Sequence, residues 1–214
     1  MSMVHELYDL KHSLAGLMIA QFAYPWEALP YIGDLILAEG RKLGDDYQRI
    51  GPEVWAHKTA SIAPTAHIEG PCIIGPNSQV RHCAYIRQVA LIGENCVVGN
   101  SVELKNCILF DGAQVPHFNY VGDSILGYKA HLGAGAVTSN VRGDKANVIV
   151  AGIETGRKKV GAFVGDRGEV GCNAVLNPGT VVGRDAQIYP TACARGIIPE
   201  AHIYKADGTI VKKN

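Results

Sequence analysis

The stretch that decides the fold is residues 62–104, IAPTAHIEGPCIIGPNSQVRHCAYIRQVALIGENCVVGNSVEL. An aliphatic side chain recurs in it at every sixth residue without a miss, at Ile62, Ile68, Ile74, Val80, Ile86, Ile92, Val98 and Leu104. A period of six fits neither the period of about 3.6 residues of a helix nor the alternation of a half-buried strand, and it is typical of hexapeptide-repeat β-helices. Each hexad predicts one flat side of a coil, with the aliphatic residue inward and Gly, Asn or Asp at the corners.

The repeat continues toward the C-terminus with two one-residue slips. Its later members are Phe110, Val115, Val121, Leu126, Leu132, Val164, Val170, Leu176, Val182 and Ile188. We therefore expect an all-β chain with a parallel β-helix over residues 56–205 and a C-terminal tail over 206–214. An excursion loop interrupts the repeat at about 141–161, VRGDKANVIVAGIETGRKKVG. Its Lys and Arg residues make it a candidate contact for a phosphorylated ligand, and the alternative is a solvated basic loop without a ligand.

Residues 1–55 lack the period of six. Two segments, LYDLKHSLAGLMI and EALPYIGDLILAEGRKLG, have apolar spacing that is compatible with helices, and Gly40 is a plausible helix end. We expect an N-terminal arm with one or two short helices, followed by a linker that leads into the first coil.

Composition limits the classes of function. The 214 residues include 20 basic and 20 acidic side chains, so the net charge offers no general attraction to nucleic acid or to an anionic membrane. No apolar run approaches a membrane span, and residues 1–20 lack the apolar segment of a signal peptide, so we expect a cytoplasmic protein. Without a CxxC pair, we expect free thiols in small core positions at Cys72, Cys83, Cys96, Cys107, Cys172 and Cys193.

Residues 116–140, PHFNYVGDSILGYKAHLGAGAVTSN, add a histidine, a tyrosine and two asparagines to this regular scaffold. HFNYVGD followed by HLGAGAVTSN, with EGPCIIG, AYIRQVALIG and VVGNSVELKN before it, resembles the acetyltransferase half of the bifunctional N-acetylglucosamine-1-phosphate uridyltransferases and related sugar nucleotidylyltransferases. The resemblance implies a left-handed β-helix, a homotrimer with sites between neighbouring prisms, acetyl-CoA as co-substrate and no metal.

The resemblance also implies roles for six residues. The catalytic base falls on His117 and its supporting carboxylate on Glu103, while the substrate ligands fall on Arg87, Lys105, Tyr120 and Asn140. These roles agree with the chemistry, because acyl transfer to an amine needs a base that titrates near neutrality. A guanidinium and an ammonium are the side chains suited to a phosphate.

The chain departs from the family pattern at several points. His131 stands where the family has an asparagine that touches the amino sugar, so we expect His131 at the substrate, and it is also a rival base. Acyl-CoA contacts are weakly predicted at Ala151, Arg157, Lys158 and Lys159, and an oxyanion donor in the turn 133–135 or near Ala151. No Gly-rich nucleotidyltransferase loop precedes residue 60, so we expect no uridyl transfer, and a separate nucleotidyltransferase is a candidate partner.

We therefore predict a CoA-dependent N-acetyltransferase for an amino sugar 1-phosphate, with glucosamine 1-phosphate favoured. Two alternatives stay open: a non-catalytic trimeric module that binds a sugar phosphate or associates with a nucleotidyltransferase, and an acetyltransferase for another small amine. A zinc enzyme of the γ-type carbonic anhydrase class is disfavoured, because position 122 is Gly where that class has a histidine ligand.

Overall fold

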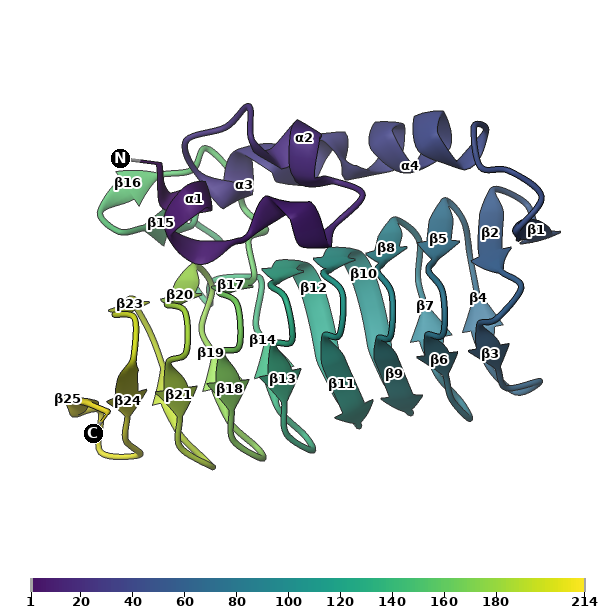
Figure 1. The fold of residues 1–214 in the computed structure, drawn as a ribbon. Helices are drawn as coiled ribbons and strands as arrows, with labels where there is room; N and C mark the ends of the chain where they lie inside the picture. The colour runs from purple at the N-terminus through teal and green to yellow at the C-terminus, as the bar shows by residue number, and fades with distance from the viewer. Residues whose placement is uncertain (1, 214) are drawn as a thin grey trace.

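The structure is a computed structural model that describes residues 2–213. Short parallel strands follow one another around a stack of coils, and each coil pairs with the next, so that the coils form a prism (Figure 1). The predicted left-handed parallel β-helix is confirmed. A helical arm, built from the N-terminal residues, lies along one side of the prism (Figure 1).

Strand pairing defines three faces of the prism. The arm face consists of β2 (Val54–His57), β5 (Cys72–Ile74), β8 (Ala90–Ile92), the C-terminal halves of β10 (Glu103–Leu109) and β12 (Tyr120–Leu126), β17 (Ala162–Val164), β20 (Thr180–Val182) and β23 (Ile197–Ile198). The polar face consists of β4 (His67–Ile68), β7 (Tyr85–Ile86), the N-terminal halves of β10 and β12, β14 (Val137–Thr138), β19 (Val175–Leu176) and β22 (Cys193–Ala194). The third face consists of β3 (Ser61–Ile62), β6 (Gln79–Val80), β9 (Val97–Asn100), β11 (Gln114–His117), β13 (His131–Leu132), β18 (Glu169–Val170), β21 (Gln187–Ile188) and β24 (His202–Tyr204).

The aliphatic residues of the repeat fill the inside of the prism in one continuous core. Ile74 lies opposite Ile92 on the next coil, and Leu104 lies opposite Val121. Side chains 17 or 18 residues apart are therefore neighbours on adjacent coils. This spacing brings residues of distant sequence onto one face.

The corners between faces use left-handed backbone. Asn77, Asn95, Asn106, Asp123 and Asn173 have φ angles between 47° and 56°. Asn and Asp tolerate this region better than most residues with a Cβ, so the predicted corner chemistry holds at these positions. Two further non-Gly residues with positive φ, Cys83 and Phe118, lie where the third face turns into the polar face.

The N-terminal arm differs from the prediction of one or two helices. It contains short helices α1 (Met3–Leu7), α2 (Gly16–Ile19), α3 (Pro25–Ala28) and α4 (Ile32–Gly40), with 3-10 turns η1 (Leu10–His12) and η2 (Leu29–Tyr31). The physical reason lies in the breaks between them. Pro25 suits the first position of α3, where Glu27 accepts the backbone N–H of Tyr24 at 2.9 Å, so a new helix begins there.

The arm covers a row of apolar side chains that point outward from the arm face. This row consists of Trp55, Ile73, Leu91, Ile108, Ile125, Phe163 and Val181, and the arm buries it together with Ile32 and Ile36 of α4. Gly40 is needed at the end of α4, because a Cβ there would come within 2.5 Å of the Trp55 ring. The arm is thus a second core joined to the prism, which the six-residue period does not reveal.

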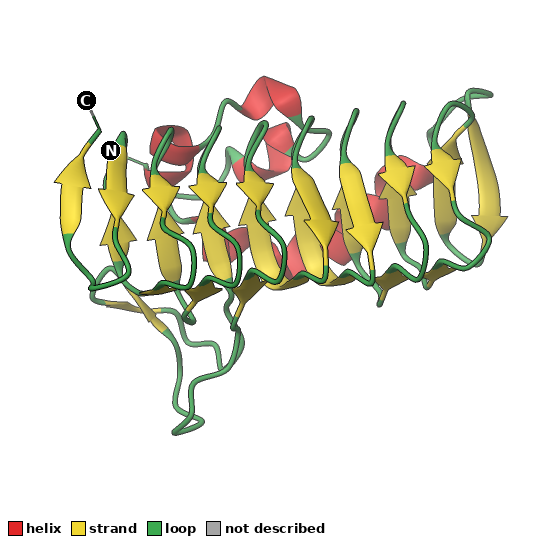
Figure 2. Ribbon diagram, turned by 90° about the horizontal axis from the view of Figure 1, so that it is seen from below, coloured by secondary structure: helices red, strands yellow, loops and turns green. Residues whose placement is uncertain are grey.

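Antiparallel strands lie at both ends of the prism. β1 (Tyr47–Gly51), in the segment expected to be a linker, pairs antiparallel with β2. β25 (Ile210–Lys212), in the expected tail, pairs antiparallel with β24. The excursion 141–161 contains the hairpin of β15 (Ile149–Val150) and β16 (Ile153–Glu154), and it projects from the prism (Figure 2).

We predict that the arm contributes strongly to stability. Ile36→Ala removes a fully buried side chain between α4 and the prism, which typically costs about 2–5 kcal/mol. Urea-induced unfolding measures the loss. Leu17→Ala is the matched control, since Leu17 on α2 is 88% exposed and its truncation is expected to change the free energy of unfolding by less than about 0.5 kcal/mol. Equal losses in the two variants would contradict a docked arm.

Candidate active site

The polar face gathers five of the residues predicted to bind or activate substrate. Parallel pairing places Glu103 beside Tyr85 on one side and Tyr120 on the other. The Arg87 guanidinium lies 3.0 Å from the Glu103 carboxylate. Lys105, Tyr120 and Asn140 come from three successive coils and meet around a single carboxylate.

That carboxylate belongs to Asp123, at the corner between the polar face and the arm face. Asp123 is 4% exposed and accepts hydrogen bonds from Lys105 Nζ at 3.2 Å, Asn106 Nδ2 at 2.9 Å and Asn140 Nδ2 at 2.6 Å. Asn140 Nδ2 also lies 3.2 Å from the Tyr120 hydroxyl oxygen, to which it donates. Asp123 therefore sets the positions of side chains from three coils at once.

The sequence prediction gave Asp123 no role. It is the last residue of the HFNYVGD motif, and it follows Lys105 by 18 residues, which is one coil of this prism. That spacing, together with the corner position of an acidic residue, is the signal that finds it. A buried carboxylate needs partners of this kind, because desolvation otherwise disfavours its charged form.

His117 lies at the end of β11, on the corner where the third face turns into the polar face, and it is exposed. Asn119 fixes the backbone of this corner. Its Oδ1 accepts the N–H of His117 at 3.1 Å, and its Nδ2 donates to the carbonyls of Gly133 and Ala136 at 2.8 and 3.0 Å. Asn119 is 3% exposed and is a second residue that the sequence prediction passed over.

The predicted contact between Glu103 and the His117 ring is absent from residues 2–213. Glu103 instead pairs with Arg87, and its backbone N–H donates to the Asn119 carbonyl at 2.9 Å. The reason is geometric: Glu103 lies on the polar face and points along the column of Tyr85 and Tyr120, whereas His117 is at the corner before that face. Glu103 as the residue that orients His117 stays a prediction.

His131 lies on the third face, apart from the cluster around Asp123. Its neighbours in the register are Gln114 and Glu169, and its Nδ1 lies 2.8 Å from the Glu169 carboxylate. A hollow of about 450 Å³ contains this pair and does not include His117; its lining is Asn95, Gly112, Gln114, Lys129, His131 and Glu169. Within one protomer, His131 and the polar face are therefore separate.

The excursion is anchored at the Asp123 corner. The Gly161 N–H donates to the Asp123 carbonyl at 2.8 Å, and the Val160 N–H donates to the Asn140 carbonyl at 3.0 Å. Ala151 lies in the two-residue turn between β15 and β16, with φ of 53°, as expected for a tight hairpin.

The basic residues of the excursion diverge. Arg157 lines a hollow of about 390 Å³ that also includes the aromatic rings Phe22, Tyr24, Trp26 and Tyr31 of the arm. Lys159 lies in the stem, bridged to Val141, and Lys158 is exposed between them. The four predicted acyl-CoA contacts thus do not share one surface with the Asp123 cluster, and their role stays a prediction.

The predicted oxyanion turn is largely occupied. The Gly133 N–H donates to the Val170 carbonyl at 2.7 Å, and the Gly135 N–H donates to the His117 carbonyl at 3.0 Å. The remaining amide of this turn, that of Ala134, is the candidate donor. The bond from Gly135 also ties the turn directly to His117.

The charges of the polar face are balanced. Arg87 pairs with Glu103 and Lys105 pairs with Asp123, so the two predicted phosphate ligands carry no surplus positive charge between them. Burial, and then the charges of Asp123 and Glu103, raise the pKa of the Tyr120 hydroxyl. Tyr120 therefore stays protonated at neutral pH and keeps its own proton to donate to a ligand.

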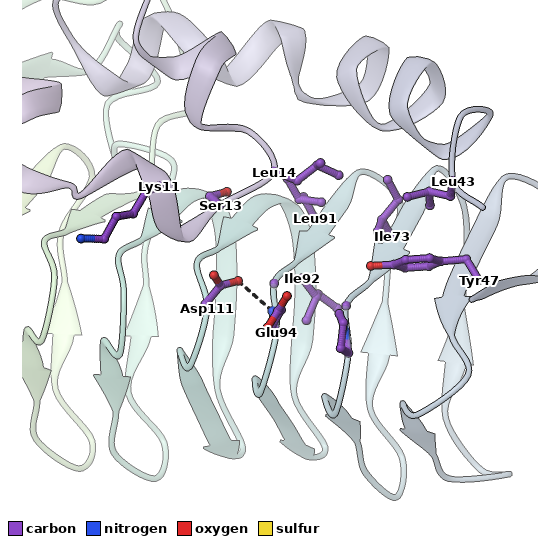
Figure 3. Close-up of a pocket in the computed structure, with 13 residues that line it drawn as sticks. Lys11, Ser13, Leu14, Leu43, Tyr47, Ile73, Leu91, Ile92, Glu94 and Asp111 are labelled. Atoms are coloured by element: carbon purple, nitrogen blue, oxygen red, sulfur yellow. Dashed lines mark hydrogen bonds between the residues drawn. The ribbon is translucent and has the colours of Figure 1, made fainter. Parts of the chain in front are cut away.

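A second groove lies between the arm and the prism. It has a volume of about 300 Å³, with an apolar floor that includes Leu14, Ile73 and Leu91 and with Glu94 and Asp111 at its rim (Figure 3). Asp111 accepts the N–H of Glu94 at 2.8 Å. This groove opens on the arm side of the prism and includes none of the predicted site residues.

The family model that matches this chain is the GMPPB C-terminal domain, over residues 68–203. The match covers more than half of the chain. The chain therefore belongs to the GMPPB C-terminal domain family.

Curated relatives agree with the predicted resemblance, which is confirmed. The bifunctional sugar-1-phosphate nucleotidylyltransferase/acetyltransferase of Sulfurisphaera tokodaii is 33% identical over 135 residues, covering 61% of this chain and 32% of the relative. The bifunctional protein GlmU of Methanococcus vannielii is 36% identical over 134 residues, with 61% and 32% covered. The chain spans about a third of the length of these relatives.

Solved structures with a similar fold include a mutant of perosamine N-acetyltransferase from Caulobacter crescentus in complex with CoA and GDP-perosamine. It has a TM-score of 0.41 and 16% identity, and covers 74% of this chain and 56% of that chain. The polysialic acid O-acetyltransferase OatWY has a TM-score of 0.39 and 13–14% identity is typical of this group, its own value being 14% with 77% and 87% covered. At this level of likeness these structures add nothing to the assignment of the site. In the part of the chain that the structure describes, no helix has the length and apolar character for crossing a membrane.

We predict that Asn119 is a structural support of the His117 corner. Asn119→Ala leaves two carbonyls and one N–H without their partner, and unsatisfied buried groups cost about 1–3 kcal/mol each. We expect the free energy of unfolding to fall by about 2–4 kcal/mol in urea titration. Asn100→Ala is the control, because Asn100 makes one exposed bond to the His82 carbonyl, and we expect it to change stability by less than about 1 kcal/mol. A loss no larger than that of the control would refute this role.

Proposed function

We propose that the chain transfers an acyl group from an acyl-CoA thioester to the amine of an amino sugar 1-phosphate, with glucosamine 1-phosphate as the favoured substrate. The observation that carries this proposal is the convergence on one face of Arg87, Glu103, Lys105, Tyr120 and Asn140, next to the corner that holds His117. The acetyltransferase activity in the name of the Sulfurisphaera tokodaii relative supports it.

In the proposed reaction the sugar amine attacks the thioester carbonyl, a C–N bond forms and the C–S bond breaks. His117 takes the proton that the amine loses, and the leaving CoA thiolate is then protonated. His117 suits this task because an imidazole titrates near neutral pH and this one is exposed to an incoming ligand.

The polar face binds the sugar phosphate in this proposal. Tyr120 donates its hydroxyl proton to a sugar or phosphate oxygen, and Asn140 is held beside it by Asp123. Arg87 and Lys105 reach the phosphate while they stay oriented by Glu103 and Asp123. Because those carboxylates balance the cations, the phosphate is selected by geometry rather than by a surplus of positive charge.

We propose further that the site lies between protomers of a homotrimer. His117 is exposed and Phe118 beside it is 60% exposed, so one prism supplies only one wall of a pocket around the base. A neighbouring prism supplies the other wall and brings a second set of residues, His131 included, toward the polar face. Sedimentation analysis tests this assembly directly, and a monomer at assay concentrations with full activity would exclude it.

The first test is a thiol-release assay with acetyl-CoA and either glucosamine 1-phosphate or galactosamine 1-phosphate. Wild type is expected to release thiol with one of them. His117→Ala should lower kcat by about 10²–10⁴, the usual contribution of general base catalysis. His202→Ala is the matched histidine control and should retain wild-type rates, because His202 lies on β24 near the C-terminal end of the prism.

Other outcomes separate the alternatives. If His131→Ala abolishes turnover while His117→Ala does not, the base is His131 with Glu169, and the assignment of His117 falls. If neither sugar phosphate supports thiol release but one raises the melting temperature, the chain is a binding module. Thiol release with a different amine alone points to another acceptor.

Asp123 provides a sharper test of the substrate site. Asp123→Asn removes the charge that holds Lys105 and disturbs the donor geometry of Asn140, and misplacement of binding groups can cost on the order of a hundredfold in rate. We expect kcat/KM for the sugar phosphate to fall about tenfold to a hundredfold. Asp144→Asn is the control, since that exposed carboxylate pairs only with Arg142 of the excursion. Equal kinetics for wild type and Asp123→Asn would remove Asp123 from the site.

A further inference from the structure

Cys83, His82 and Thr65 form a chain of contacts on an exposed corner of the prism. The Cys83 Sγ lies 3.2 Å from His82 Nε2, and His82 Nδ1 lies 2.7 Å from the Thr65 hydroxyl. The Cys83 backbone N–H donates to the same hydroxyl at 3.3 Å. Thr65 comes from the preceding coil, so the stacking of coils brings the three groups together.

This order of groups is that of an activated nucleophile: a thiol, a base within hydrogen-bond reach and a third group that orients the base. When His82 Nδ1–H donates to Thr65, Nε2 is the acceptor that faces Sγ. The thiol proton then passes to the ring and leaves a thiolate beside an imidazolium. A neighbouring imidazolium is one of the recognised causes of a reactive cysteine.

The other cysteines lack this arrangement within residues 2–213. Cys72, Cys96 and Cys107 are buried, and burial raises the pKa of Cys96 and of Cys107 to about 12. Cys172 and Cys193 are exposed like Cys83, but neither contacts a histidine; Cys193 Sγ accepts a bond from Asn177 at 3.1 Å. The expectation that all six thiols fill core positions is therefore wrong for three of them, because their positions lie at corners or on outer faces.

We propose that Cys83 is an activated thiol and a site of reversible modification by low-molecular-weight disulfides. The Cys83 thiolate attacks one sulfur of the disulfide, a new S–S bond forms, the old S–S bond breaks, and the other half leaves as a thiolate that takes up a proton. Excess thiol reverses the reaction by the same exchange. This proposal does not depend on acyl transfer.

The location gives the modification a consequence for the neighbouring corner. Asn100 donates to the His82 carbonyl at 3.2 Å, and Asn100 lies opposite His117 in the register of β9 and β11. A group attached to Cys83 therefore lies on the same edge of the prism as His117, two coils away.

The test is the rate of reaction with glutathione disulfide at pH 7, followed for each cysteine by peptide mass spectrometry. Cys172 and Cys193 are controls within the same molecule. An ordinary thiol is only a few per cent ionised at this pH, so full ionisation, tempered by lower nucleophilicity, should make Cys83 react about tenfold faster. His82→Gln should reduce the Cys83 rate to that of Cys172 and leave the other two rates unchanged.

Each remaining outcome is decisive. Equal rates for Cys83 and Cys172 in the wild type, or a Cys83 rate that His82→Gln does not change, would overturn the proposal. A variant that unfolds is recognised because the buried Cys96 and Cys107 then react as well. In that case Thr65→Val replaces it, and a Cys83 rate that does not fall relative to Cys172 refutes the orienting role of Thr65 and the proposal with it.

Discussion

The hydrogen bonding of each coil to the next is the constraint on which the rest of the structure depends. Because successive coils are 17 or 18 residues long, side chains at that spacing are neighbours whatever lies between them. Lys105 meets Asp123 in this way, and Thr65 meets His82. A scaffold of this kind converts a simple repeat into columns of functional groups, and a change in coil length displaces every column beyond it.

The polar face shows how such columns are stabilised. It carries two cations and two carboxylates in alternation, and Asp123 is almost fully buried. A buried charge is tolerated only when paired and hydrogen-bonded, and Asp123 has partners from three side chains. Rigidity of the side chains is the result, and it suits a face that recognises a polar ligand by the placement of its groups.

The sequence predicted the prism and most members of the cluster, but not the relations among them. The inward positions from Ile62 to Leu104 are local and periodic, so they can be counted. The pairing of Glu103 with Arg87 could not be predicted, since both lie within reach of several partners and only the register selects one. The arm was misjudged for a related reason: its helices are short and are held by the apolar row around Phe163, which belongs to a different part of the chain.

The two antiparallel strands at the ends of the prism have a consequence for association. A stack of parallel coils ends in a row of unpaired backbone groups, on which a second stack can add and extend into a fibre. β1 and β25 run against the direction of the coils that they cover, and each is followed or preceded by a turn rather than by another coil. They close the stack at both ends, so copies of this chain are directed to meet through their sides.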